Sequence, residues 1–172
     1  MKYITLSLLF LVISICALAQ NPYAATIKAQ AETMSRFMMK KDYKAFAKYT
    51  YPKIAEMAGG EDKMIAAMTK SLDDMEKGGV TFKGVTIGDP GSAITVGQEI
   101  QCTVPQTLAM KIPKASLTAQ STLIAISPDG GKKWYFLDTS RQDLAKLQKS
   151  IPTLSDKLVL PKYPAPVVVP DK

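Results

Sequence analysis

The side chains that could carry out catalysis are few, and their types limit the chemistry. The chain has 172 residues and no histidine, which excludes a Ser/His/Asp triad, a Cys/His dyad and a histidine-based zinc helix. Its two cysteines are too few for a disulfide framework or a four-cysteine metal site. Carboxylates and tyrosine hydroxyls remain, since burial can tune a carboxylate to act as a base. We therefore expect no metal and no cofactor.

One carboxylate stands at the end of an aromatic strand. Alternation places Trp134, Phe136 and Asp138 on one face of the segment that follows Lys133. As a functional site, this face would be a pocket wall with an acid at its rim. The alternative is that Trp134 and Phe136 belong to the core and Asp138 ends the strand in solvent. Aromatic residues on alternating strands are usually buried, which favours the alternative.

Two tyrosines flank a predicted helix break. Tyr49 and Tyr51 lie beside Pro52, so their hydroxyls could reach into a pocket between elements. The alternative, which we favour, is that each ring packs on the core and leaves its hydroxyl at the surface. Together with the strand, the pocket candidates are Tyr49, Tyr51, Trp134 and Asp138.

Sulfur chemistry is not expected from this chain. Cys102 shares a predicted strand face with Ile100 and Val104, which is typical of a small buried hydrophobe and not of a redox thiol. The methionines of the helical half recur at helical spacing, which indicates an adaptable core in preference to a soft-metal site.

The formal net charge is +7, and lysine carries almost all of the positive charge. Arg36 and Arg141 are the only arginines, whereas sequence-specific nucleic-acid binding relies on arginine for bidentate contacts. The glycine pairs at 59–60 and 78–79 follow helical segments and do not form a phosphate loop. We therefore expect no nucleic-acid partner.

Residues 1–19 have the pattern of a secretory signal peptide. Lys2 precedes an apolar run, and Ala17-Leu18-Ala19 matches a cleavage site. We predict cleavage after Ala19 and export to the periplasm or the extracellular space, with no transmembrane span in the mature chain. The alternative is an uncleaved anchor or a lipoprotein attached through Cys16, which the bulky Ile15 before it disfavours.

Composition divides the mature chain into a domain at 20–150 and a Pro-rich, extended, poorly folded tail at 151–172. Helix formers dominate residues 22–77, and β-branched residues dominate 80–139. Helices followed by strands indicate an α+β fold. We expect helices at 22–40, from Asp42 to a break at Pro52, at 61–77, and from a Ser140 cap to Lys149. We expect strands near 80–87, 99–112, 116–127 and 132–138, with a short stretch at 94–96 before the second.

Two of these elements carry further expectations. Helix 61–77 carries an apolar stripe of Ile65, Met68, Leu72 and Met75, which predicts a buried face. Pro105 falls inside the longest strand, so we expect a bulge or a sheet edge there.

The run SPDGGKKWYFLD at 127–138 resembles the final hairpin of the nuclear transport factor 2-like superfamily, also called cystatin-like. The runs TYPKIAEMAGGEDKMIAAM at 50–68 and CTVPQTLAMKIP at 102–113 look like those of small exported bacterial proteins with this fold. The resemblance implies N-terminal helices packed on a curved antiparallel sheet of about four strands. The resulting cone would have a pocket at its open end, and homodimers would form through the open sheet face.

The leading hypothesis is an exported, non-enzymatic domain that binds a small apolar ligand in the cone or docks an envelope protein. One alternative is a pocket enzyme of the isomerase or dehydratase type, with Asp138 and a tyrosine as the acid–base pair. The other is a structural envelope protein that acts through the Pro-rich tail.

Overall fold

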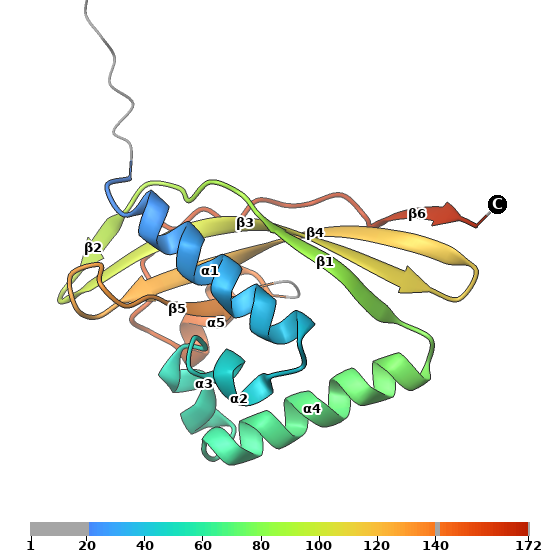
Figure 1. The fold of residues 1–172 in the computed structure, drawn as a ribbon. Helices are drawn as coiled ribbons and strands as arrows, with labels where there is room; N and C mark the ends of the chain where they lie inside the picture. Colours follow the sequence, from blue (N-terminus) through green and yellow to red (C-terminus); the bar gives the residue numbers. More distant parts are fainter. Residues whose placement is uncertain (1–20, 140–141, 172) are drawn as a thin grey trace, which may run out of the picture.

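The computed structural model of the chain describes residues 21–139 and 142–171 (Figure 1). The predicted signal peptide, including Lys2 and Cys16, and the predicted cap Ser140 lie outside these residues. The helices are α1 (Ala24–Met39), α2 (Tyr43–Ala47), α3 (Pro52–Met57), α4 (Glu61–Lys77) and α5 (Leu144–Ser150). The strands are β1 (Thr81–Ile87), β2 (Ile94–Val96), β3 (Glu99–Ile112), β4 (Ala115–Ser127), β5 (Tyr135–Asp138) and β6 (Val167–Pro170). This order confirms the α+β class.

Local capping chemistry sets the helix boundaries. The Asp42 carboxylate accepts a hydrogen bond from the Ala45 amide and caps α2. Pro52 occupies the first turn of α3, where its missing N–H costs nothing. Helix α5 begins at Asp143, whose carboxylate accepts from the Lys146 amide. The cap of α5 is thus Asp143 and not Ser140, because the capping residue must stand directly before the first helical turn.

The sheet is open and antiparallel and has six strands, in the order β1-β3-β4-β5, with β2 on β3 and β6 on β4. The expected number was about four. The difference comes from β2 and β6, which pair over only a few residues at the edges of the long β3–β4 ladder. Strand β2 is only three residues long, and β6 pairs with residues far earlier in the chain, so local sequence patterns indicate neither pairing clearly.

Pro105 lies at a sheet edge. The β3–β4 register runs without a break from Ile100 opposite Ser127 to Ile112 opposite Ala115, so no bulge occurs at the proline. Its carbonyl accepts a hydrogen bond from the Gly88 amide just past the end of β1. The proline therefore faces the gap between β1 and β2, where no ladder needs its missing N–H.

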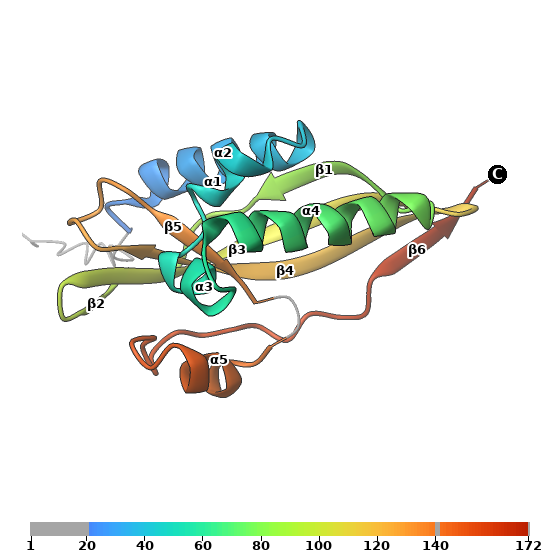
Figure 2. The same cartoon turned by 90° about the horizontal axis from the view of Figure 1, so that it is seen from below.

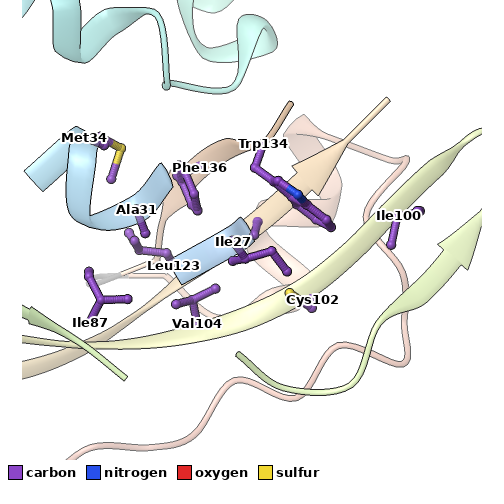
Figure 3. Close-up of a cluster of buried hydrophobic side chains, with 11 residues drawn as sticks. Ile27, Ala31, Met34, Ile87, Ile100, Cys102, Val104, Leu123, Trp134 and Phe136 are labelled. Atoms are coloured by element: carbon purple, nitrogen blue, oxygen red, sulfur yellow. The ribbon is translucent and has the colours of Figure 1, made fainter. Parts of the chain in front are cut away.

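Helix α1 covers one face of the sheet. Its buried side chains Ile27, Ala31 and Met34 pack on a cluster from β3, β4 and β5 that includes Trp134 and Phe136 (Figure 3). Trp134 is fully buried and donates its indole N–H to the Gly131 carbonyl. Trp134 and Phe136 are therefore core residues, as the alternative interpretation predicted.

The opposite face carries a second core. Figure 2 shows α1 and α5 on opposite sides of the sheet. On the α5 side, Ile151, Leu154 and Leu158 are buried with Leu147 against Ile124 and other β4–β5 side chains. The segment after residue 150 is extended as expected, but its first part is packed and not poorly folded, because its apolar residues cover strands that are apolar on both faces.

A buried amide joins this segment to the sheet. Gln101 on β3 is fully buried and donates from Nε2 to the Thr153 carbonyl at 2.9 Å and to Glu99 at 3.0 Å. Its Oε1 accepts from the Ser155 amide at 2.9 Å. One side chain thus satisfies two backbone groups of the C-terminal segment.

Helix α4 is only partly packed. It contacts α2 and α3, and Met64 is its one buried residue, whereas Ile65, Met68, Leu72 and Met75 are half-buried. The stripe was predicted to be buried, and this is wrong because its four side chains are only half-buried. The reason is that the helix stands away from the sheet and its apolar face borders a cavity. Among the described helices, none is long and apolar enough to span a membrane.

Replacing Gln101 with leucine tests its role as the link to the C-terminal segment. The change keeps the volume but leaves the Ser155 amide and the Thr153 carbonyl without a partner, so we expect the free energy of unfolding to fall by about 2 kcal/mol. Urea denaturation measures this, with the exposed Gln98→Leu as the control, expected within about 0.5 kcal/mol of wild type. Equal stability of the two variants would show that the link contributes nothing.

Candidate functional site

The cavity lies between α1, α4 and the sheet and has a volume of about 430 Å³. Met68 and Leu72 of α4 form one wall, and Met34 and Met38 of α1 form another. The sheet supplies the floor through apolar side chains of four strands: Phe82, Val85, Leu108, Leu123, Phe136 and Leu137. A volume in this range with predominantly apolar walls is typical of small-molecule sites.

Polar groups in the cavity are few. Gln106 projects from β3 into the floor and donates from Nε2 to Ser121 Oγ across the strand pair at 2.9 Å. Ser35 on α1 is committed to its own helix, since its hydroxyl donates to the Ala31 carbonyl. Asp138 and Gln142 are exposed and lie at the rim. Thr50 is the remaining polar residue of the described lining. The site therefore has an apolar body with few polar groups.

A second hollow of about 580 Å³ adjoins the cavity along β4. The two share Phe82, Leu108, Asp138 and Gln142 in their walls. The outer wall of the second hollow is the C-terminal segment, where the Tyr163 hydroxyl lies 3.0 Å from Thr122 Oγ1. The space under α4 therefore continues towards the C-terminal segment as an elongated trough.

Of the four pocket candidates, Asp138 is the one that lines the cavity. It is the last residue of β5, pairs with Leu123 of β4 in the ladder, and lies at the rim of the cavity. Trp134, four residues earlier on the same face, is sealed in the core under α1. Phe136, between them, contributes to both the core and the cavity wall. The boundary between core and cavity therefore runs along this single strand.

The two tyrosines are held elsewhere by the edge of β5. The Phe136 amide donates to the Tyr49 carbonyl at 2.7 Å, and the Tyr51 amide donates to the Phe136 carbonyl at 3.1 Å. The Tyr49 ring lies under the Lys133 ammonium, 3.6 Å from ring centroid to Nζ. The Tyr51 hydroxyl donates to Glu99 at 3.0 Å, and burial raises the pKa of Tyr51. Neither ring lines the cavity, so the proposed pair of Asp138 and a tyrosine is not brought together there.

Gln106 and the α4 residues Met68 and Leu72 were not among the sequence candidates. A signal for Gln106 was available, since the alternation of Cys102, Val104 and Leu108 puts it on a core-facing row. A polar side chain on such a row needs a partner or a function.

Cys102 is the one described cysteine and is fully buried. Burial raises the pKa of its thiol to about 12, against a smaller opposing effect of Asn21. A protonated, inaccessible thiol is a poor nucleophile, which agrees with the expectation of a buried hydrophobe. Among the described residues, no group of three or more cysteine, aspartate and glutamate side chains is arranged to hold a metal ion.

A further hollow, of about 610 Å³, runs between α1 and β1. Charged residues of both signs border it, including Lys28, Glu32 and Arg36, and Lys28 is paired with Asp89 at 2.9 Å. It is an open surface depression with solvated charges, so it is a weaker candidate for ligand binding than the apolar cavity.

No family model, no curated protein and no solved structure matches this chain. Function is therefore argued from the cavity itself.

The thiol of Cys102 should be unreactive in the folded protein. At pH 8 we expect negligible alkylation by iodoacetamide under native conditions and complete alkylation in urea, because both burial and a pKa of about 12 suppress the thiolate. Mass spectrometry assigns the adduct to Cys102. Rapid native labelling at this residue would contradict the packing of β3 under α1.

Proposed function

We propose that the protein is an exported, non-enzymatic binding protein that holds a small apolar ligand between α4 and the sheet. The observation that carries this proposal is the cavity of about 430 Å³ bordered by the half-buried apolar stripe of α4. Keeping apolar surface in contact with water costs about 25 cal/mol per Å². A ligand that covers the stripe removes this cost.

Helix α4 is held at its two ends, which explains why it does not pack down onto the sheet and fill the cavity. Gly59 and Gly60 precede it and Gly79 follows it, all with positive φ, which sets the chain direction at both helix ends. Lys41 and Glu76 form an ion pair with 2.6 Å between Nζ and the carboxylate. The helix is thus fixed by its ends to its neighbours, and its middle spans the cavity.

Binding without catalysis is supported by which groups meet in the cavity. An acid–base enzyme needs its proton donor and acceptor within reach of one substrate atom. Asp138 lies at the rim, whereas Tyr49 and Tyr51 bond Phe136 through their backbones and lie outside the lining. A binding protein requires only the apolar walls and a few orienting polar groups.

The nuclear transport factor 2-like cone is part of the proposal. Helices on one face of a long antiparallel sheet, with a cavity beneath α4, support it. Export rests on the pattern of residues 1–19. Docking of an envelope protein on the sheet is less favoured, because α5 and residues 151–158 cover one face of β4 and β5.

A cavity-filling substitution tests the site. We expect the fluorescent apolar probe N-phenylnaphthylamine to bind wild type, and Leu108→Trp to weaken binding at least tenfold, about 1.4 kcal/mol, because the indole occupies the cavity floor. The matched control is Ala109→Trp, since the neighbouring residue points to the opposite face. It should bind the probe like wild type.

Thermal unfolding of both variants should first establish that they are folded. Absence of probe binding to wild type, or equal binding by folded Leu108→Trp, would refute the proposed site.

A further inference from the structure

A buried polar pair connects the cavity with the adjoining hollow, since Gln106 lines the first and Ser121 lines the second. Gln106 on β3 and Ser121 on β4 are directly opposite each other in the register. They are only 6% and 3% exposed, and the neighbouring pairs on this row, Val104 with Leu123 and Leu108 with Ala119, are apolar. Burying an amide and a hydroxyl in such surroundings costs free energy unless all their hydrogen bonds are made.

The pair satisfies itself only in part. Gln106 Nε2 donates to Ser121 Oγ, but Gln106 Oε1 accepts no hydrogen bond from the described residues. No buried side-chain polar atom of the described chain lacks a partner, so this oxygen is not sealed in the protein. Gln106 lines the cavity, and its acceptor therefore opens onto the cavity space. Ser121 Oγ accepts from the amide and retains its own O–H as a donor.

The pair thus offers an acceptor on Gln106 at the cavity and a donor on Ser121 at the adjoining hollow, and the two spaces share Leu108 in their walls. A hydroxyl group is the simplest function that both donates and accepts, so it can pair with the two together. An ether or an ester oxygen only accepts and leaves Gln106 Oε1 without a donor. Because an unpaired buried polar group costs free energy, the site should bind a ligand with a hydroxyl more tightly than the same ligand with an ether.

Charge on the lining disfavours anionic ligands. The described residues that line the cavity include the carboxylate Asp138 and no lysine or arginine, although the chain as a whole carries a formal charge of +7. A carboxylate buried beside the neutral floor would lose its hydration without gaining a counter-charge from these residues.

We infer that the ligand is a neutral aliphatic alcohol, whose hydroxyl bonds Gln106 and Ser121 and whose apolar chain lies under α4. The adjoining hollow along β4 gives room for the chain to extend towards Tyr163. This inference rests on the proposed function and narrows its ligand to one chemical class.

The test compares three probes of matched chain length: decanol, decyl methyl ether and decanoate. Each competes with N-phenylnaphthylamine for the purified protein. We expect decanol to bind about fivefold to tenfold more tightly than the ether, which corresponds to one net hydrogen bond, and decanoate to bind more weakly than decanol. This comparison uses wild type alone and does not depend on the folding of any variant.

The double variant Gln106→Leu with Ser121→Ala should bind the alcohol and the ether equally while it still binds N-phenylnaphthylamine. The control variant Gln98→Leu, which changes an exposed glutamine, should keep the preference. Equal binding of the alcohol and the ether by wild type, or tighter binding of decanoate, would overturn the inference and leave the proposed function intact. Failure of all three compounds to displace a bound probe also overturns the inference, whereas failure of the probe itself to bind overturns the proposed function.

Discussion

The length of the β3–β4 ladder is the constraint on which the rest of the structure depends. Strand β4 has 13 residues and so extends about 44 Å, whereas the 16-residue α1 is about 24 Å long. One helix cannot cover one face of this ladder, and the uncovered apolar row must meet another element. Helix α4 takes this place, but the chain reaches it through α2 and α3 at one end and β1 at the other. The ladder is therefore packed tightly under α1 and loosely under α4.

The same division separates the half of the sheet that is packed on both faces from the half that borders the cavity. Where α1 and α5 lie on opposite faces (Figure 2), β4 is buried on both sides. Ala125 lies in the cluster that includes Ile27 of α1, and Ile126 lies in the cluster that includes Leu147 of α5. Gln101 secures the C-terminal segment to this half by satisfying backbone groups on it. Further along the same strand, Gln106 is also buried but lies on the opposite face, where its side-chain oxygen borders the cavity. Two buried glutamines on one strand thus differ in their surroundings: Gln101 bonds the C-terminal segment, and Gln106 is the one proposed to bind a ligand.

Local signals were sufficient to predict much of the fold. The Gly59-Gly60 break and the apolar periodicity predicted both ends of α4 correctly, and the alternation around Cys102 predicted β3 equally well.

The cavity could not be predicted, because the pattern of Leu72 and Met75 is the same for a helix packed on a sheet and for one held away from it. The distance between helix and sheet depends on how α2 and α3 turn the chain. The burial of Leu154 and Leu158 could not be predicted either. Nearby prolines indicate an extended segment, but they do not show what that segment packs against. Of the pocket candidates, Asp138 lines the cavity. Its position could be predicted because strand alternation and the end of a strand are both local features of the sequence. Tyr49 and Tyr51 do not line the cavity, because backbone hydrogen bonds to the edge of β5 set their positions.

The methionines allow the most direct test of the central claim that an apolar ligand occupies the space between α4 and the sheet. Met34, Met38 and Met68 line the cavity from two helices, whereas Met57 on α3 is 55% exposed and lies outside its lining. In the methyl-labelled protein with bound decanol, nuclear Overhauser effects from the ligand chain should reach the methyl groups of Met34, Met38 and Met68 and should not reach that of Met57. Ligand contacts confined to Met57, or spread equally over all methionines, would contradict a ligand beneath α4.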